Sequence, residues 1–311
     1  MVDVMTPVKS VRAYGRLANL YFLDYNLAYP MVATLLPAAV VREGRTWAAF
    51  GVIIAGYFLV HCALIAFDDI TGFRDGSDAK NYRDNPSALR RAHWKPLVTG
   101  ELRLPQALRF SWICLLSGLA LLVVGLLIAP YHPLWLIVLA VVGACISVQY
   151  SYGLKLSHIG FQELVLFLFT MQLVFVPFWA LTGGVTTRSM IEGGLFAFWL
   201  MMVSWYSNLR DIETDRGVGR INVATMTGER TYINLLGVLA VADIIVVFAL
   251  IAVDELPLAF GLLLCPVFAL RFVQFRLGAI KRNPLVGRLL GRRLAWTGAV
   301  LMAIGNLFLA N

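Results

Sequence analysis

Long apolar runs alternate with short polar segments along almost the whole chain. Nine of these runs come close to the roughly 20 residues that a helix needs to cross the hydrocarbon core of a bilayer. They cover residues 20–41, 47–67, 106–129, 133–151, 161–182, 192–209, 231–253, 256–275 and 291–310. The pattern predicts an all-α, polytopic membrane protein, a bundle of about nine transmembrane helices that forms one domain over residues 1–311.

The polar connections differ in length between the two ends of this predicted bundle. Residues 70–104 and 210–230 form long connections at one end, whereas 130–133 and 183–191 are short connections at the other. The long segment 70–104 also contains leucines and a tryptophan among its basic residues, which predicts a cap of short amphipathic helices over the bundle. We therefore expect the chemistry at the end with the long connections.

The basic residues predict which end faces the cytoplasm, because cytoplasmic loops are enriched in Lys and Arg. With the N-terminus inside, only Arg42, Arg45 and Arg188 fall on the outer side, and the other 23 of the 26 basic residues lie in or beside inner segments. This arrangement predicts an integral membrane protein with its N-terminus and its long connections on the cytoplasmic side.

Composition supports the membrane class and excludes others. Hydrophobic residues make up 59% of the 311 positions and charged residues 14%, against about 25% charged in an ordinary soluble domain. The net charge of +8 is spread over the predicted inner loops, where membrane orientation and anionic lipid explain it better than nucleic-acid binding does. The four cysteines and four histidines are scattered, without the paired spacing of a zinc or redox site.

Two acidic clusters hold eight of the eighteen carboxylates and follow the second and sixth apolar runs. Carboxylates massed beside lipid are costly unless a cation compensates them, and hard divalent cations such as Mg²⁺ prefer oxygen ligands. The first cluster contains Asp68, Asp69, Asp75, Asp78 and Asp84, and the second contains Asp211, Glu213 and Asp215. A solvated helix end would explain either cluster alone, but two at the same end favour a bound cation.

Spacing within the clusters matches one helix face. Asn208, Asp211 and Asp215 fall at i, i+3 and i+7, and Asp68 and Asp75 are also seven residues apart. The glycines of the first cluster predict a broken helix there.

Magnesium held between two carboxylate groups implies a ligand rich in phosphate, for which a diphosphate is the natural candidate. No phosphate loop or dinucleotide fingerprint is present, so nucleotide chemistry lacks support. An apolar tail on the diphosphate would explain the membrane setting, and 19 Phe, 11 Tyr and 8 Trp could shelter an allylic cation. Basic residues for the remaining diphosphate oxygens lie nearby: Arg74, Lys80, Arg90, Arg91, Lys95, Lys155, Arg210, Arg216 and Arg220.

These motifs resemble those of the UbiA superfamily of intramembrane prenyltransferases, whose members have nine helices and two Asp-rich motifs on the cytoplasmic side. The second motif, Asn208 to Arg216, and the run Gly219 to Val223 are close to the family form. The first motif resembles the menaquinone-type version, with Asp68 where Asn is usual and Gly72 in place of an Asp. Further similar stretches are Tyr150-Ser151, Lys155-Leu156, Gly160, Glu163, Lys95-Pro96-Leu97 and Gly100.

The resemblance implies roles for specific residues. Metal ligands would be Asp68, Asp69, Asp75, Asp78, Asn208, Asp211 and Asp215. Diphosphate would be bound by Lys95, Lys155, Arg210, Arg220, Tyr150 and Asn208. The residues expected to be catalytic are Asp68, Asp211, Lys155 and Tyr150.

The implied activity is Mg²⁺-dependent transfer of a prenyl group from a polyprenyl diphosphate to an aromatic or other lipophilic acceptor. Two alternatives stay open, a terpene cyclase of the same family and a membrane transporter or ion-binding protein. The first run has Asn26 to Pro30 where many family members have a basic residue before proline, so the acceptor is not assigned. Asp24 is a candidate for the acceptor pocket, and Asp243 is a candidate for a functional role or for a hydrogen bond to a neighbouring helix.

Overall fold

The computed structural model describes residues 7–20, 23–84, 91–217 and 219–308. Their regular structure is helical, as predicted, apart from an isolated bridge between Ile159 and Ile221. The helices are α1 Pro7–Leu17, α2 Ala28–Leu35, α3 Ala38–Val41, α4 Gly44–Arg74, α5 Leu104–Ile128, α6 Leu134–Val148, α7 Gln162–Thr182, α8 Thr187–Gly217, α9 Val223–Thr227, α10 Glu229–Ala252, α11 Leu258–Phe275 and α12 Pro284–Phe308. Short helical turns are η1 Asp24–Leu27, η2 Ala79–Asp84, η3 Ala92–Trp94, η4 Leu156–His158 and η5 Arg276–Ile280.

Five of the described helices are long and apolar enough to cross a membrane: α4, α5, α7, α10, and α11 with the turn after it. The apolar helix α6 is shorter, and α8 and α12 have 31 and 25 residues. The protein is thus an all-α membrane protein, while the number of nine spans and the cap of short helices stay predictions.

The first predicted span, 20–41, is not one helix in the described residues. Instead η1, α2 and α3 follow one another, and residues 21 and 22 lie outside the described part. Leu36 is extended, with ψ of 134°, directly before Pro37. A residue before proline is pushed out of the helical region, and this explains the break.

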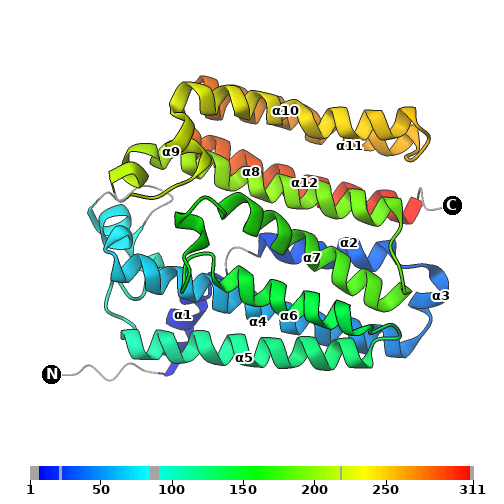
Figure 1. The fold of residues 1–311 in the computed structure, drawn as a ribbon, viewed down its shortest axis with the longest axis horizontal. Helices are drawn as coiled ribbons and strands as arrows, with labels where there is room; N and C mark the ends of the chain where they lie inside the picture. The colour runs from blue at the N-terminus through cyan, green and yellow to red at the C-terminus, as the bar shows by residue number, and fades with distance from the viewer. Residues whose placement is uncertain (1–6, 21–22, 85–90, 218, 309–311) are drawn as a thin grey trace.

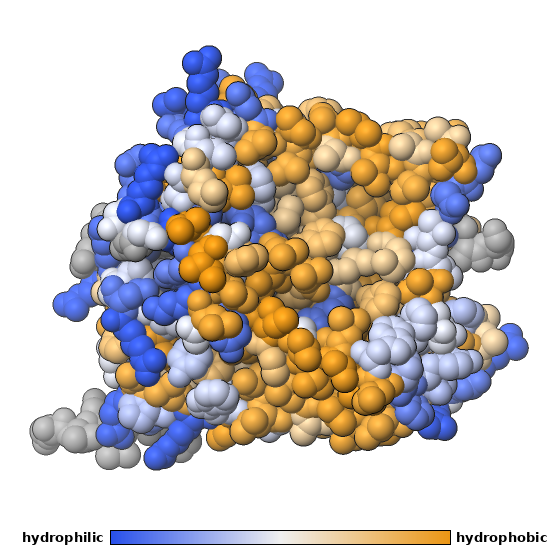
Figure 2. All heavy atoms as spheres, in the orientation of Figure 1, coloured by the Kyte–Doolittle hydropathy of each residue, from blue (hydrophilic) through white to orange (hydrophobic). Residues whose placement is uncertain are grey.

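The long helices lie side by side in a bundle, and the polar connections gather at one end (Figure 1). In the figure α8 and α4 run toward the left, where α9 and the turns after α4 lie. Helix α8 packs against both α7 and α12, and α4 packs most closely on α5. We call the left end of Figure 1 the polar end. Figure 2 shows hydrophobic residues over the middle of the same face and hydrophilic ones at the polar end.

Glycines allow α4 and α5 to approach at backbone distance. A Cβ on Gly56 would lie 2.8 Å from the backbone nitrogen of Leu122, and one on Gly118 would lie 2.9 Å from the carbonyl oxygen of Gly56. A Cβ on Gly125 would lie 2.8 Å from Ile53. Small residues at such contacts are typical of helices that associate in lipid, where close packing replaces the hydrophobic effect.

The carboxylate of Asp243 is held inside the bundle by an ion pair. Arg271 of α11 lies 3.3 Å from it, and the side chains of both residues are 0% exposed. Trp199 of α8 donates a hydrogen bond to the same carboxylate at 2.8 Å. Arg271 also donates to Gln274, which donates in turn to the carbonyl of Gly287. The predicted hydrogen bond from Asp243 to a neighbouring helix is confirmed, and it belongs to a network that joins α8, α10 and α11.

Asp24 is also paired. Both of its oxygens accept hydrogen bonds from Arg292 of α12, at 2.7 and 2.9 Å, and the indole of Trp296 donates to it at 2.5 Å. These contacts tie η1 to the middle of α12.

Candidate functional site

The first acidic cluster begins on the last turns of α4. The helix continues through Gly72 and ends at Arg74, so the predicted break at the glycines is wrong for Gly72. The chain turns at Gly76 instead, where φ is +79°, a value that glycine adopts without strain. Asp68 and Asp69 therefore project from a regular helix, and Asp75 caps its end.

Lys95 lies between two carboxylates of this cluster. Its Nζ is 2.5 Å from Asp69 and 3.0 Å from Asp78, and it lies over the ring of Tyr82. Burial lowers the pKa of Lys95, but the two aspartates outweigh this effect and raise it well above its usual range. Burial also raises the pKa of Asp78, although Lys95 opposes the shift.

Gly72 explains how Asp78 reaches this position. A Cβ at residue 72 would lie 2.7 Å from the carboxylate carbon of Asp78. The carboxylate that the family motif would carry at residue 72 is thus absent, and that of Asp78 occupies the space beside it.

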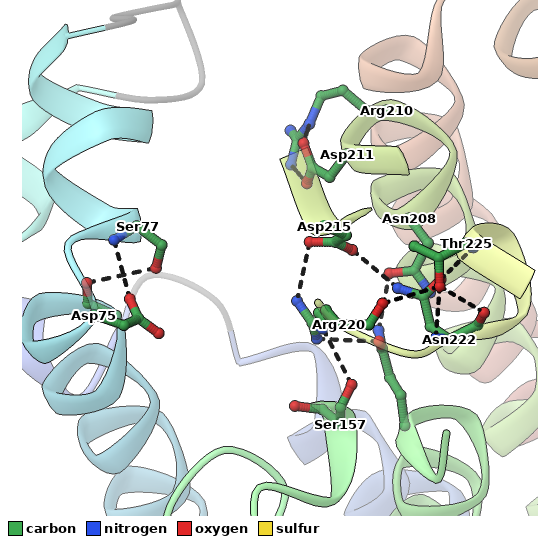
Figure 3. Close-up of polar contacts among 12 residues, drawn as sticks. Asp75, Ser77, Ser157, Asn208, Arg210, Asp211, Asp215, Arg220, Asn222 and Thr225 are labelled. Carbon is green, nitrogen blue, oxygen red and sulfur yellow. Dashed lines mark hydrogen bonds and ion pairs between the residues drawn. The ribbon is translucent and has the colours of Figure 1, made fainter. Parts of the chain in front are cut away.

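Asp68 and Asp75 are exposed, unlike Asp69 and Asp78. The backbone N–H of Ser77 donates to Asp75 at 3.0 Å, which fixes the turn after α4. Figure 3 shows Asp75 and Ser77 across from Asp211, Asp215 and Arg220. The side chain of Asp84 lies outside the described residues.

The second cluster lies on the last three turns of α8. This helix is continuous to Gly217, so Asn208, Asp211 and Asp215 have the predicted helical spacing. Asn208 is buried, accepts a hydrogen bond from Gln162 and donates one to Glu163.

Asp211 and Asp215 are each held by an arginine. Arg210 donates two hydrogen bonds to Asp211, at 2.7 and 2.5 Å. Arg220 lies 3.7 Å from Asp215, which also accepts a hydrogen bond from Asn222 at 2.9 Å. Asn222 in turn caps α9 by accepting from the backbone of Thr225 (Figure 3).

The connection between α6 and α7, residues 149–161, joins the two clusters. The hydroxyl of Thr71 on α4 donates to the carbonyl of Ser151 at 3.0 Å. At the other end of this α6–α7 loop, Arg220 donates to the carbonyl of Ser157 at 3.1 Å. The backbone N–H of Ile221 donates to the carbonyl of His158 at 2.9 Å. The loop therefore contacts α4 on one side and the segment after α8 on the other.

The pKa shifts of Tyr150 and Arg220 include contributions from both clusters. Burial raises the pKa of Tyr150 to about 12, a shift that Arg220 opposes and Asp68 increases. Burial lowers the pKa of Arg220, but Tyr150, Asp215 and Asp68 outweigh it and raise it. The charge of Asp68 on α4 thus contributes to the raised pKa of the arginine that holds Asp215.

Lys155 is exposed on the α6–α7 loop in an uncommon backbone conformation, with φ of +51°. A non-glycine residue in this left-handed region is strained, and such strain clusters at functional sites. With Arg220 it acts on His158, whose pKa is lowered first by burial and then by these two cations.

The donor set of the two clusters fits Mg²⁺ bound together with a ligand. In the part of the chain that the structure describes, no three His, Cys, Asp or Glu side chains converge on one point as a complete metal centre. Mg²⁺ is usually held by one or two carboxylates plus substrate phosphates and water, so opposed carboxylates at a distance are compatible with it. Asp68 and Asp75 on one side and Asp211 and Asp215 on the other would supply the oxygen ligands it prefers.

Three residues of the site, Gln162, Ser157 and Asn222, make contacts that were not predicted from sequence. Gln162 donates to Asn208 and accepts from Arg220 at 3.1 Å, and Ser157 offers its carbonyl to the same arginine. These contacts depend on the fold of the α6–α7 loop and of the start of α7. Asn222 could have been found from the sequence. Asn222 and Thr225 have the three-residue spacing of a capping box, in which the N-cap side chain and the third helical residue bond to each other's backbone.

Comparison with protein families gives one match over most of the chain. The model of the UbiA prenyltransferase family matches residues 29–284. No curated protein matches the sequence.

Solved structures with the same fold are distant in sequence. A UbiA homolog from Aeropyrum pernix K1 is 17% identical with a TM-score of 0.61, over 89% of this chain and 96% of that one. A UbiA homolog from Archaeoglobus fulgidus bound to DMAPP and Mg²⁺ is 14% identical with a TM-score of 0.59, over 94% and 99%. A structure described for digeranylgeranylglyceryl phosphate synthase in membranes is 15% identical with a TM-score of 0.62, over 96% and 99%. At these identities the likeness shows a shared fold.

Proposed function

The chain belongs to the UbiA prenyltransferase family, and from this premise we propose that it transfers a prenyl group from a polyprenyl diphosphate to an aromatic or other lipophilic acceptor. The observation that carries the proposal is the pair of acidic clusters opposed at the polar end of an apolar bundle (Figures 1 and 3). Such an end can hold the charged diphosphate while the bundle receives the apolar tail.

The two clusters have complementary roles in this proposal. Carboxylates of both clusters would hold Mg²⁺, which would supply positive charge to offset the negative charge that develops on the leaving diphosphate. Asp68 and Asp211 are the ligands we regard as most important, with Asp69, Asp75, Asp78, Asn208 and Asp215 around them. The proposal is supported by the exposure of Asp68 and Asp75 beside the paired carboxylates.

Basic and phenolic groups complete the diphosphate site. Arg220 and Tyr150 lie together against the α6–α7 loop, and Lys155 is exposed on that loop. We assign them, with Lys95 and Arg210, to the oxygens of the diphosphate. The family's Archaeoglobus homolog is described with DMAPP and Mg²⁺, which supports this class of donor for the present chain.

The membrane orientation follows from the basic residues. We place the N-terminus and the polar end on the cytoplasmic side, because 23 of the 26 Lys and Arg residues fall in or beside segments of that side. A cytoplasmic polar end would face the aqueous pool of Mg²⁺ and release diphosphate there.

Diphosphate release tests the proposal. Protein purified in lipid nanodiscs is incubated with Mg²⁺ and prenyl diphosphates of several lengths, with and without aromatic acceptors, and compared with Asp68→Ala and Asp211→Ala. Release that needs an acceptor and disappears in both variants supports the transferase. Release without an acceptor, with a cyclic hydrocarbon or alcohol as product, would establish a terpene cyclase instead.

Two other outcomes contradict the proposal. Ion flux in liposomes without diphosphate release from any donor would favour a transporter. Release that is unchanged in both variants would show that the metal site lies elsewhere.

A further inference from the structure

A stripe of polar side chains runs inward from the first acidic cluster along α4. His61 lies seven residues before Asp68, and Tyr57 lies four residues before His61, spacings that place all three on one helix face. Seven residues correspond to a rise of about 10 Å, so His61 lies roughly two turns deeper than Asp68. Both inner residues are buried, with His61 5% and Tyr57 0% exposed.

The polar atoms of this stripe lack hydrogen-bond partners among the described residues. They are Nε2 of His61 and the hydroxyl of Tyr57. Nδ2 of Asn26 on η1 also lacks a hydrogen-bond partner among the described residues. A buried polar atom without a partner costs about 1–3 kcal/mol. Such atoms are rare in folded proteins and call for an explanation, of which a bound ligand is one.

One aromatic ring meets His61 from η1, and a second ring packs against the first. The ring of Tyr25 meets the imidazole edge-on at 5.0 Å between centroids, and meets Phe169 of α7 at 5.8 Å. Tyr25 is also within electrostatic reach of Tyr150, which belongs to the proposed diphosphate site. Tyr25 therefore contacts His61 directly.

We infer that Tyr25, His61 and Asn26 form the acceptor subsite, and that it takes an aromatic acceptor whose hydroxyl donates a hydrogen bond to Nε2 of His61. The inference rests on the proposed function. The rings supply flat surfaces for an aromatic molecule, since aromatic pairs are favourable at 4.5–7 Å. His61 supplies a buried nitrogen that can accept a proton, and it lies about 10 Å deeper along α4 than Asp68.

The chemical step balances with the groups named. A ring carbon of the phenolic acceptor forms a bond to C1 of the prenyl group, while the bond from C1 to oxygen breaks and its electron pair leaves with the diphosphate. The hydroxyl proton of the acceptor passes to Nε2 of His61, which leaves a neutral dienone. The dienone loses its ring proton to water and regains a hydroxyl proton as it becomes aromatic again, and the imidazolium returns its proton to water.

The test compares His61→Phe with the native protein on two acceptors, a phenol and its methyl ether. We expect transfer to the phenol to fall by about 100-fold, the lower end of what a general base contributes. Transfer to the ether, which has no proton to give, should be similar in both proteins. The donor KM should stay within about twofold, because the diphosphate contacts lie about 10 Å away.

Two further variants control for structure. His61→Gln keeps a hydrogen-bonding group, so the acceptor KM should stay near that of the native protein while kcat falls. His132→Phe changes a histidine at the opposite end of the bundle, where its Nδ1 lies 2.9 Å from the carbonyl of Ala129, and should leave transfer unchanged.

The outcomes separate this inference from the proposed function. Native-like transfer to the phenol by His61→Phe, or an equal loss on phenol and ether, would overturn the role of His61 while leaving the prenyltransferase intact. A native protein that releases no diphosphate from any donor would overturn the proposed function, and the inference with it.

Discussion

Two groups of carboxylates and arginines in this protein, one inside the bundle and one at its polar end, differ in how their charges are paired. Asp243 and Arg271 are fully buried, and Trp199 and Gln274 bind them further. At the polar end, Asp68 and Asp75 stay exposed although several cations lie nearby. Each pairing in the interior joins helices to one another, whereas the polar end leaves carboxylate oxygens open.

The difference separates structural from functional charge. A buried ion pair must satisfy itself, because an uncompensated charge in lipid is very costly. A site for a cation must instead leave some carboxylate oxygens unpaired, so that they can bind the cation. Replacing residues in the two groups should therefore change different properties, stability in the first group and activity in the second.

The largest effect is expected for Asp243→Ala. This change leaves Arg271 buried without its carboxylate, and breaking such a pair costs about 3–5 kcal/mol. Thermal unfolding in nanodiscs should show the loss, while diphosphate release per folded molecule stays near native. The double variant Asp243→Leu with Arg271→Met should recover most of the stability, and a double variant as unstable as the single one would contradict the structural role.

Asp211→Ala should lower activity and leave stability nearly unchanged, the reverse of Asp243→Ala. We expect release to fall by a factor on the order of 10²–10³, as for removal of one stabilising group from a charged transition state. Its unfolding temperature should fall only slightly, because the pair that Asp211 forms with Arg210 is partly exposed and such a pair contributes about 1 kcal/mol or less. Glu213→Ala is the matched control from the same turn, since the Glu213 side chain is 89% exposed, and it should leave release unchanged.

Arg220→Lys tests whether geometry or charge matters at the second cluster. The guanidinium donates to the carbonyl of Ser157 and to Gln162 and lies beside Asp215, and a lysine cannot make all three contacts. We expect a loss of about 10–100-fold in kcat/KM, the range seen when groups that orient metal ligands are replaced. Native activity in this variant would show that charge alone suffices.

Gly72→Ala should have the smallest effect. The new methyl group would press on Asp78 at 2.7 Å and move its carboxylate away from Lys95, so we expect the donor KM to rise about tenfold, equivalent to about 1.4 kcal/mol. Gly51→Ala is the control on the same helix, because nothing lies within 4 Å of its Cβ. If both variants bind the donor alike, the packing of Asp78 on Gly72 has no role in binding.

The sequence predicted the parts of the site that depend only on the spacing of nearby residues along one helix. The spacing of Asn208, Asp211 and Asp215 requires only that α8 continue, and the helix does continue. The hydropathy pattern likewise located the long helices, because a helix in lipid must be apolar over most of its length. Metal binding and sidedness stay predictions.

What sequence could not give are contacts between distant segments. Arg271 lies 28 residues from Asp243, and the hydropathy pattern did not indicate that the two would meet. His61 was one of four scattered histidines, and only the approach of Tyr25 and the missing partner of Nε2 distinguish it. The role of Gly72 also appears only when Asp78 folds back onto α4.

The α6–α7 loop has a consequence for engineering. It touches α4 through Ser151 and the segment after α8 through Ser157 and His158, with only a few residues between these anchors. Its length limits how far apart the two anchoring segments, the end of α4 and the segment after α8, can lie. Inserting or deleting a residue between Tyr152 and Lys155 would change that separation while leaving every carboxylate and every long helix untouched.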